Sequence, residues 1–435
     1  MKRHFTRHTL LGALLLASSS LMAQDTPVAI RGAKLIPVSG PEIENGVLVV
    51  HRGKITAVGG AGTAIPRNAR IIDGRGKVVM PGLVDSHSHV GGGDGGDGSA
   101  AQHPDVRIVD AINPNSDTFN KARAGGITTV NVMPGSGHLL SGQTAYLKLR
   151  ANPRRIEDLL VNRSLDGIYG GIKMANGTNS LRAGGGTFPA TRGRSALMQR
   201  NLFIKAQEYQ KKVREAGGDA SKMPARDLQM EAMVEVLEGK RMVHYHTHTH
   251  YDILTVLRLK EEFGFRVVLH HVSDAWAVAD EIAAAGVASS IIHIDAPGGK
   301  LETMNITPEN GAALERAGAD FGYHTDDGIT DSRVFLRSAA FGMRNGVSRA
   351  KALEAMTLAG ARMLDLQDRI GSLDVGKDAD FIILNGDPFS VYTRIEQTWV
   401  EGDKVFDFSD PEQRGFATGG LDVFRETNVH VACEH

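Results

Sequence analysis

The stretch Pro81-Gly82-Leu83-Val84-Asp85-Ser86-His87-Ser88-His89 is an apolar run that ends in a His-x-His pair. In a β-strand, side chains two positions apart point to the same face, so both imidazoles can face one point at the end of the strand. Barrels of parallel strands place their chemistry at this end. A glycine-rich loop, residues 91–98, follows. We therefore interpret His87 and His89 as metal ligands at the carboxyl end of a strand.

A histidine-rich run, residues 244–250, ends a second apolar segment. Its four histidines alternate with other residues, so all four would share one face of a strand, and only one or two can lie at the strand end. We select His246 as the metal ligand, with His248 as the alternative. His250 is expected to be a solvent-facing loop residue.

Two later segments also end in residues that can bind a metal ion. The segment 266–271 ends in His270 and His271, and we expect His271 to bind metal and His270 to face the helix layer. The segment 320–325 is followed by Asp326, the candidate acidic ligand. The adjacent Asp327 is expected to cap a helix or to accept hydrogen bonds.

Lys173 follows a short apolar segment that, counted in β–α units from His87, falls on the fourth strand. An ammonium group cannot bind a cation. A buried lysine that has reacted with carbon dioxide carries a carbamate, however, whose two oxygens can bridge two metal ions. The alternative is a structural or surface lysine.

The order of predicted elements gives the fold class. Strands alternate with helices through the middle of the chain, which predicts parallel strands with helices outside them. The segment 81–365 therefore fits one α/β domain, a (β/α)8 TIM barrel, of which ~250 residues is the typical size. A polar helical insertion is expected at 197–238. The strands are expected at 126–132, 241–247, 266–271, 287–294 and 320–325.

Both ends of the chain outside the barrel read as short strands separated by Gly and Pro. The N-terminal part, residues 24–80, and the C-terminal part, residues 366–435, are predicted to form one small β-sandwich domain together. The expected strands lie within 28–58, 379–384 and 398–405.

The first 23 residues are predicted to be a signal peptide. A basic start (Lys2, Arg3 and Arg7) precedes the apolar run 10–17, and small residues lead to Ala23. The apolar run is far shorter than the ~20 residues that span a bilayer, which argues against the alternative of an uncleaved anchor. Export with Cys433 as the single cysteine fits a periplasmic or secreted bacterial protein.

The nearly equal numbers of basic and acidic side chains bear on which kinds of partner the chain can bind. With 49 basic and 50 acidic side chains, the chain does not favour nucleic acid or an anionic membrane surface as a partner. We expect a small-molecule substrate and no membrane contact after signal cleavage. The sequence is compatible with a homo-oligomer.

Taken together, the pattern His87-x-His89, Lys173, His246, His271 and Asp326 resembles the amidohydrolase superfamily. Within it the chain is most similar to the imidazolonepropionase-related branch, which includes metal-dependent dipeptidases. Residues 79–85 and 371–380 carry the rest of the resemblance. It implies a carboxylated Lys173 that bridges two divalent metal ions, most simply Zn²⁺, with His246 and His271 on one of them.

The resemblance implies hydrolysis of an amide or related C–N bond by a metal-activated hydroxide. Asp326 would take the proton from the water and pass it to the leaving amine. The first alternative is a ring deaminase or a cyclic amidase with one metal ion. In the family such deaminases use a glutamate soon after the fifth-strand histidine, and the residues directly after His246 include none. The second alternative is a non-catalytic periplasmic metal-binding protein, against which Asp326 argues.

Two groups of residues keep open interpretations. Arg182, Arg192 and Arg194 are candidates to bind a substrate carboxylate bidentately, and the alternative is that they are exposed solubilising groups. His324, beside the final aspartate, has no role that the sequence assigns.

Overall fold

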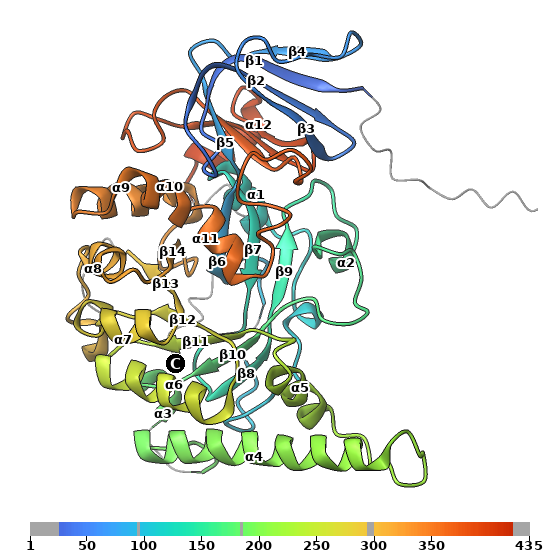
Figure 1. The fold of residues 1–435 in the computed structure, drawn as a ribbon, viewed down its shortest axis with the longest axis vertical. Coiled ribbons are helices and arrows are strands. Elements are labelled where there is room, and N and C mark those ends of the chain that lie inside the picture. The colour runs from blue at the N-terminus through green and yellow to red at the C-terminus, as the bar shows by residue number, and fades with distance from the viewer. Residues whose placement is uncertain (1–25, 94–95, 183–185, 294–299, 421–435) are drawn as a thin grey trace, which may run out of the picture.

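The computed structural model describes residues 26–93, 96–182, 186–293 and 300–420. The predicted signal peptide and Cys433 lie outside the described residues. Within them the strands form three sheets, two of which carry the candidate site. Figure 1 shows the sheet made from the chain ends at one extremity of the molecule and the long helix α4 at the other.

Strands from both ends of the chain are hydrogen-bonded into one eight-stranded mixed sheet. Its order is β17-β16-β15-β5-β1-β2-β3, with β4 beside β1. The two ends meet where β5 pairs antiparallel with β15, with Val78 opposite Leu384 and Pro81 opposite Phe381. The sequence predicted a β-sandwich from these segments, and the hydrogen bonds describe a single sheet. Its strands are β1 (Val28–Leu35), β2 (Ile43–His51), β3 (Lys54–Gly59), β4 (Arg70–Asp73), β5 (Val78–Pro81), β15 (Phe381–Leu384), β16 (Ile395–Val400) and β17 (Asp403–Asp407).

The other two sheets hold the predicted ligand-bearing strands. One has the order β14-β13-β12-β11-β10-β8 and the other β6-β7-β9. Neighbouring strands from β10 to β14 are parallel, as is the pair β6 and β7. The parallel strands are β6 (Leu83–Ser88), β7 (Ile127–Val132), β10 (Ile172–Ala175), β11 (Val243–Thr247), β12 (Val267–His271), β13 (Ala288–Ile292) and β14 (Phe321–His324).

The third strand differs from the prediction of eight parallel strands, because it runs antiparallel to its neighbours. Residues 140–148 form β8 (Leu140–Gln143) and β9 (Ala145–Lys148), which run antiparallel to β10 and β7 respectively. The connection from β7 is short, residues 133–139, whereas a crossover to a parallel strand needs about a dozen residues or more. This segment therefore returns antiparallel and joins the two sheets.

Between β14 and β6 the strand ladder is replaced by a few hydrogen bonds. Asp326 N donates to His87 O at 2.9 Å, and Thr325 N donates to the Asp85 carboxylate at 3.0 Å. The Thr325 hydroxyl also donates to Asp85, at 2.5 Å. These contacts hold the last strand beside the first at the position where both carry candidate ligands.

Helices cover the outside of the parallel strands (Figure 1). In α6 (His250–Phe263) the Thr249 side chain accepts from Asp252 N at the start, and Gly264 ends the helix in a left-handed conformation. Ile253, Val256 and Leu259 form its buried stripe, spaced three residues apart. The other helices that follow these strands are α7 (Ala279–Ala284), α8 (Asn310–Ala317), α9 (Leu336–Arg344), α10 (Arg349–Ala355) and α11 (Leu358–Met363).

The helical insertion is present as two helices. They are α4 (Arg192–Ala216) and α5 (Leu228–Leu237), close to the predicted span of 197–238. Phe203 on α4 is fully buried and stacks against Phe263 and Phe265, with ring centroids 4.7 and 4.9 Å apart. The insertion is thus packed on the element that follows β11.

A buried ion cluster joins β9 to the sheet of the chain ends. The Lys148 side chain is fully buried, and its Nζ lies 2.5 Å from Asp378, 2.9 Å from Asp380 and 3.3 Å from Glu401. Arg150 adds an ion pair to Glu401 at 2.7 Å. Removing one partner of a buried pair costs more than the pair contributes, because the remaining charges stay desolvated.

We expect Lys148→Met to lower the free energy of unfolding by about 3–5 kcal/mol, because it leaves carboxylates buried without their ammonium partner. Urea unfolding followed by circular dichroism measures the change. The matched control is Lys211→Met, since the Lys211 side chain is 72% exposed and its pairing with Glu215 spans 3.7 Å. That variant should stay within about 0.5 kcal/mol of wild type. Equal stabilities for the two variants would contradict the role given to the cluster.

Candidate metal centre

The first group of candidate ligands joins β6 to the segment after β14. His89 Nδ1 is hydrogen-bonded to Met133 O at 2.8 Å, which leaves Nε2 to face Asp326 Oδ1 at 2.9 Å. His87 Nε2 lies 3.3 Å from the same oxygen. The three side chains could hold one metal ion, so the structure brings the His-x-His motif and Asp326 together.

The second group lies at the ends of β11 and β12. The ring centroid of His246 lies 4.6 Å from that of His248 and 4.4 Å from that of His271. The centroids of His248 and His271 are 5.0 Å apart. This trio could also hold a metal ion. Ser273 Oγ lies 2.8 Å from His248 Nδ1, and Lys300 Nζ lies 3.4 Å from His248 Nε2. Both candidates from the histidine-rich run are therefore in the cluster.

Asp326 and Lys173 lie where the two groups meet. Asp326 Oδ2 is 3.9 Å from His271 Nδ1, while Oδ1 faces the first group. Lys173 is fully buried on β10, with Nζ 3.1 Å from His87 Nε2. Its Nζ also lies 2.9 Å from Met133 Sδ. The surface alternative for Lys173 is thereby excluded, because the side chain is fully buried.

His270 is a correction to the sequence analysis, which placed it against the helices. Its Nε2 lies 2.9 Å from His244 Nδ1, and its ring centroid is 4.9 Å from that of His87. Neighbours on a regular strand point to opposite faces. Here His271 has a φ of 70° and Val272 one of 39°, so the left-handed backbone at the strand end turns His271 back toward the side that His270 already faces.

His250 is exposed and Asp327 accepts hydrogen bonds, as the sequence analysis predicted. The His250 side chain is 53% exposed, although the residue begins α6 rather than lying in a loop. Asp327 accepts hydrogen bonds from Lys121 Nζ at 2.6 Å and Ser332 N at 2.9 Å.

The three candidate arginines do not converge on one point. Arg192 Nε donates to both carboxylate oxygens of Asp252 at 3.0 Å. Arg182 lies over the ring of Phe188, and Arg194 is exposed. Arg192 also lines a cavity of about 270 Å³ beside the start of α6.

Sequence reasoning missed two carboxylates near the site. Asp85 spans the junction between β6 and β14, and burial raises its pKa to about 7. Glu302 is buried, its Oε2 accepts from Thr178 N at 2.8 Å, and its Oε1 lies 4.0 Å from His248 Nε2. The pattern Pro-Gly-Leu-Val-Asp before His87 could have drawn attention to Asp85, whereas Glu302 has no strand or motif beside it in the sequence.

Burial keeps the clustered imidazoles neutral. It lowers the pKa values of His87, His246, His248 and His271 well below their usual range, and the positive charge of Lys173 lowers them further. A neutral imidazole has a free lone pair, which is the form that binds a metal ion.

The donor set fits a divalent cation. Both ring nitrogens of His246, Nε2 of His271 and Nδ1 of His87 are buried without a hydrogen-bond partner. A buried polar atom without a partner costs free energy unless a ligand satisfies it. Imidazole nitrogens with a carboxylate are typical ligands of zinc and similar ions.

Comparison with known proteins decides the family. The model of the amidohydrolase family matches residues 78–406, which is most of the chain. The chain belongs to the amidohydrolase family. It is therefore a hydrolase that acts on carbon–nitrogen bonds, in a family that generally binds divalent metal ions.

Three relatives place this amidohydrolase more closely. The crystal structure of an amidohydrolase from Thermotoga maritima MSB8 superposes with a TM-score of 0.81 at 30% identity, covering 87% of this chain and all of that one. Amidohydrolase tasK of Hapsidospora irregularis is 27% identical over 83% of this chain, which spans 40% of the length of that protein. A 5-methylthioadenosine/S-adenosylhomocysteine deaminase of Symbiobacterium thermophilum is 24% identical over 88% of this chain and 92% of its own length.

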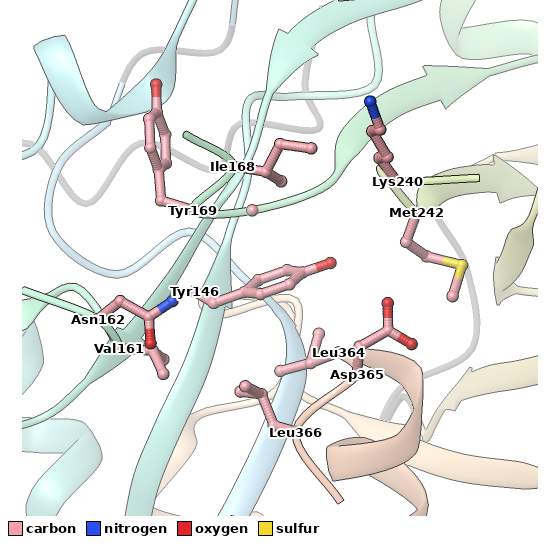
Figure 2. Close-up of a pocket in the computed structure, with 11 residues that line it drawn as sticks. Tyr146, Val161, Asn162, Ile168, Tyr169, Lys240, Met242, Leu364, Asp365 and Leu366 are labelled. Carbon is pink, nitrogen blue, oxygen red and sulfur yellow. The ribbon is translucent and has the colours of Figure 1, made fainter. Parts of the chain in front are cut away.

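A second cavity of the amidohydrolase lies before the parallel strands β10 and β11, and Figure 2 labels Tyr146, Tyr169 and Met242 among the residues that line it. Its volume is about 220 Å³, and Gly170 and Met242, which precede β10 and β11, help to line it. Tyr146 also lines it, and its hydroxyl is hydrogen-bonded to His244 Nε2 at 2.8 Å. Because parallel α/β sheets bind their ligands at the carboxyl ends of the strands, we assign the site to the histidine groups and not to this cavity.

Proposed function

We propose that this amidohydrolase cleaves an amide or related C–N bond of a small molecule at a centre of two divalent metal ions, most simply Zn²⁺. The observation that carries the proposal is the meeting of two ligand groups at Asp326. One carboxylate oxygen faces His89 at 2.9 Å, and the other lies 3.9 Å from His271. A single ion would not need both groups.

The residues would divide between the two ions as follows. His87, His89 and Asp326 would hold one, and His246 with His271 the other, with His248 as the alternative or additional ligand. Lys173, as a carbamate, would bridge them from its position beside His87. When bound, the ions supply Lewis acidity that activates water near neutral pH and polarises the substrate carbonyl.

Asp326 is suited to carry the proton. Burial alone would raise its pKa, but the His89 imidazole, 2.9 Å away, and the nearby Lys173 ammonium lower the pKa below its usual value. The carboxylate is therefore ionised at neutral pH and can accept a proton from the attacking water. It would then donate this proton to the leaving nitrogen.

Deamination of a ring at a single metal ion is the second candidate. It is favoured by Glu302, a buried carboxylate whose Oε1 lies 3.6 Å from Lys300 Nζ and 4.0 Å from His248 Nε2. A glutamate there could serve as the proton carrier that a deaminase needs. Lys173 between the two ligand groups favours the two-ion hydrolase instead.

The substrate class follows from the site only in outline. The cavity of about 270 Å³ beside β10 and α6 is lined by polar side chains, including Asn176, Arg192 and Gln199. We propose that it receives the part of the substrate that is not cleaved. A screen of N-acyl amino acids, dipeptides and cyclic ureides, with detection of the released amine, identifies the substrate class.

We also propose the division into residues 24–80, 81–365 and 366–435, with the site-bearing strands acting as one barrel, and export of the chain after removal of residues 1–23. The basic, apolar and small residues at the N-terminus support export. In the part of the chain that the structure describes, no helix is both long and apolar enough to cross a membrane.

The first prediction from the proposed function concerns the number of metal ions. Elemental analysis should find two divalent ions per wild-type chain, and Lys173→Ala should lose at least one of them because the bridging group is gone. Uptake by the metal-free wild type should increase with added bicarbonate, and uptake by the variant should not. Lys205→Ala, an exposed lysine on α4, is the control. One ion in wild type, together with full activity of Lys173→Ala, would overturn the two-ion proposal.

The second prediction separates binding from proton transfer. Asp326→Asn should keep much of its metal, because an amide oxygen can still coordinate, but kcat should fall by about 10²–10⁴-fold because an amide cannot carry the proton. KM should change less, since the proton moves in the transition state. Steady-state kinetics at full metal occupancy measure both.

The companion variant is Glu302→Gln. Under amide hydrolysis it should retain most of kcat. If Glu302→Gln instead loses turnover while Asp326→Asn keeps it, the deaminase is the better description of this site.

The third prediction concerns export. The mature protein from its native host should lack about the first 23 residues, as measured by intact-mass spectrometry. Replacing Leu14 and Leu15 with Asp should block this cleavage by breaking the apolar run. A mature protein that begins at Met1 would refute the signal peptide.

A further inference from the structure

His324, the last residue of β14, is a buried imidazole with a partner on each ring nitrogen. Its Nδ1 lies 2.7 Å from Ser290 Oγ, and its Nε2 lies 3.2 Å from His271 Nδ1. The residue is fully buried. It therefore touches a candidate ligand directly without being one of the residues that the family pattern marks.

The contact continues beyond His324 as a chain of hydroxyl groups. Ser290 Oγ on β13 lies 2.7 Å from Ser86 Oγ on β6. Both serines are fully buried. The chain Ser86–Ser290–His324–His271 thus links the strand that carries the His-x-His motif to the end of β12.

Two opposite placements of protons satisfy these contacts. The one that leaves His271 Nε2 able to bind a metal ion runs from His271 toward Ser86. His271 Nδ1–H donates to His324 Nε2, His324 Nδ1–H donates to Ser290 Oγ, and the Ser290 hydroxyl donates to Ser86 Oγ. In this arrangement His271 Nε2 carries the lone pair, and this nitrogen has no hydrogen-bond partner. The His271 ring centroid lies 4.4 Å from that of His246, so the free nitrogen belongs to the second ligand group.

A direct ligand role for His324 is the competing explanation. His324, His87 and His271 have ring nitrogens close enough to hold an ion. Both nitrogens of His324 are already engaged, however, by Ser290 and His271. The other two members belong to the two groups described above, so an ion here would compete with both.

We propose that His324 is a positioning residue that selects the tautomer of His271, so that His271 presents Nε2 to the metal ion shared with His246. The inference rests on the proposed two-ion function. A histidine ligand commonly has its second nitrogen fixed by a hydrogen bond, and removing such a partner typically lowers metal affinity about 10–100-fold. Here the partner is itself an imidazole, which is held by Ser290, and Ser290 in turn contacts Ser86.

The test compares three variants in a competition between the protein and a chelator for Co²⁺ or Zn²⁺. His324→Phe keeps a planar ring but cannot hydrogen-bond, and it should weaken one of the two ions about 10–100-fold. The second ion should change by less than about twofold. His324→Gln, whose side-chain oxygen can still accept from His271 Nδ1, should restore part of the loss. The visible spectrum of bound Co²⁺ should shift in His324→Phe, because the geometry at His271 is released.

A double-mutant cycle tests the chain behind His324. Ser290→Ala should weaken the same ion in the wild-type background and have no further effect in His324→Phe, because Ser290 acts through His324. Tyr323→Phe is the matched control. Tyr323 lies on β14 beside His324 and is also fully buried. The variant loses one hydroxyl that has no hydrogen-bond partner, so the affinities for both ions should stay at wild-type values.

Three outcomes would overturn the inference. His324→Phe could bind both ions as wild type does. It could lose both ions equally while the metal-free protein melts at a lower temperature, which would make His324 a core residue. It could lose one ion as completely as His271→Asn with no recovery in His324→Gln, which would make His324 a ligand. If wild type itself binds no ion, the proposed function fails, and this result is distinct from the other three.

Discussion

Packed imidazoles at the ends of the parallel strands impose the constraint on which the site depends. Burial makes the charged form of each ring costly, so the rings remain neutral, and each has two polar nitrogens to satisfy. The fold holds one nitrogen of several rings with a fixed partner. His89 is hydrogen-bonded to Met133 O, His248 to Ser273 and His324 to Ser290. The opposite nitrogen of His89 thereby faces Asp326, and that of His248 lies 3.4 Å from Lys300 Nζ.

The junction between the first and last strands gives this arrangement its precision. Asp85 accepts two hydrogen bonds from Thr325, the residue before Asp326. It also accepts from His87 N at 3.3 Å. One buried carboxylate therefore sets the distance between His87, a candidate ligand on β6, and Asp326 after β14. The left-handed φ of 48° at Asp326 is held by these contacts, since a non-glycine residue rarely adopts it unaided.

Much of this site could be predicted from the sequence, because parallel strands bring their carboxyl ends to one place. The expectation that candidate ligands follow apolar strands singled out His87, Lys173, His246, His271 and Asp326, and the structure brings all five together. The strands around them were predicted for the same reason.

What could not be predicted depends on contacts between residues far apart in the chain. The rule of alternating faces failed at His270 because a left-handed residue follows it. The antiparallel course of residues 140–148 depends on the length of a loop, and no hydrophobic period marks it. Glu302 approaches His248 only through tertiary packing, and His324 acquires its contacts from Ser290 on a neighbouring strand.

The pairing of β5 with β15 has a consequence for how the chain is made. About 300 residues separate Val78 from Leu384, its partner in the ladder, and a ribosome adding ~5–20 residues per second needs roughly 15–60 s to cover that distance. During this interval one edge of β5 is a row of unpaired backbone groups, which is a template for association with other chains. Newly made protein therefore depends on being kept apart from its copies until its final strands emerge.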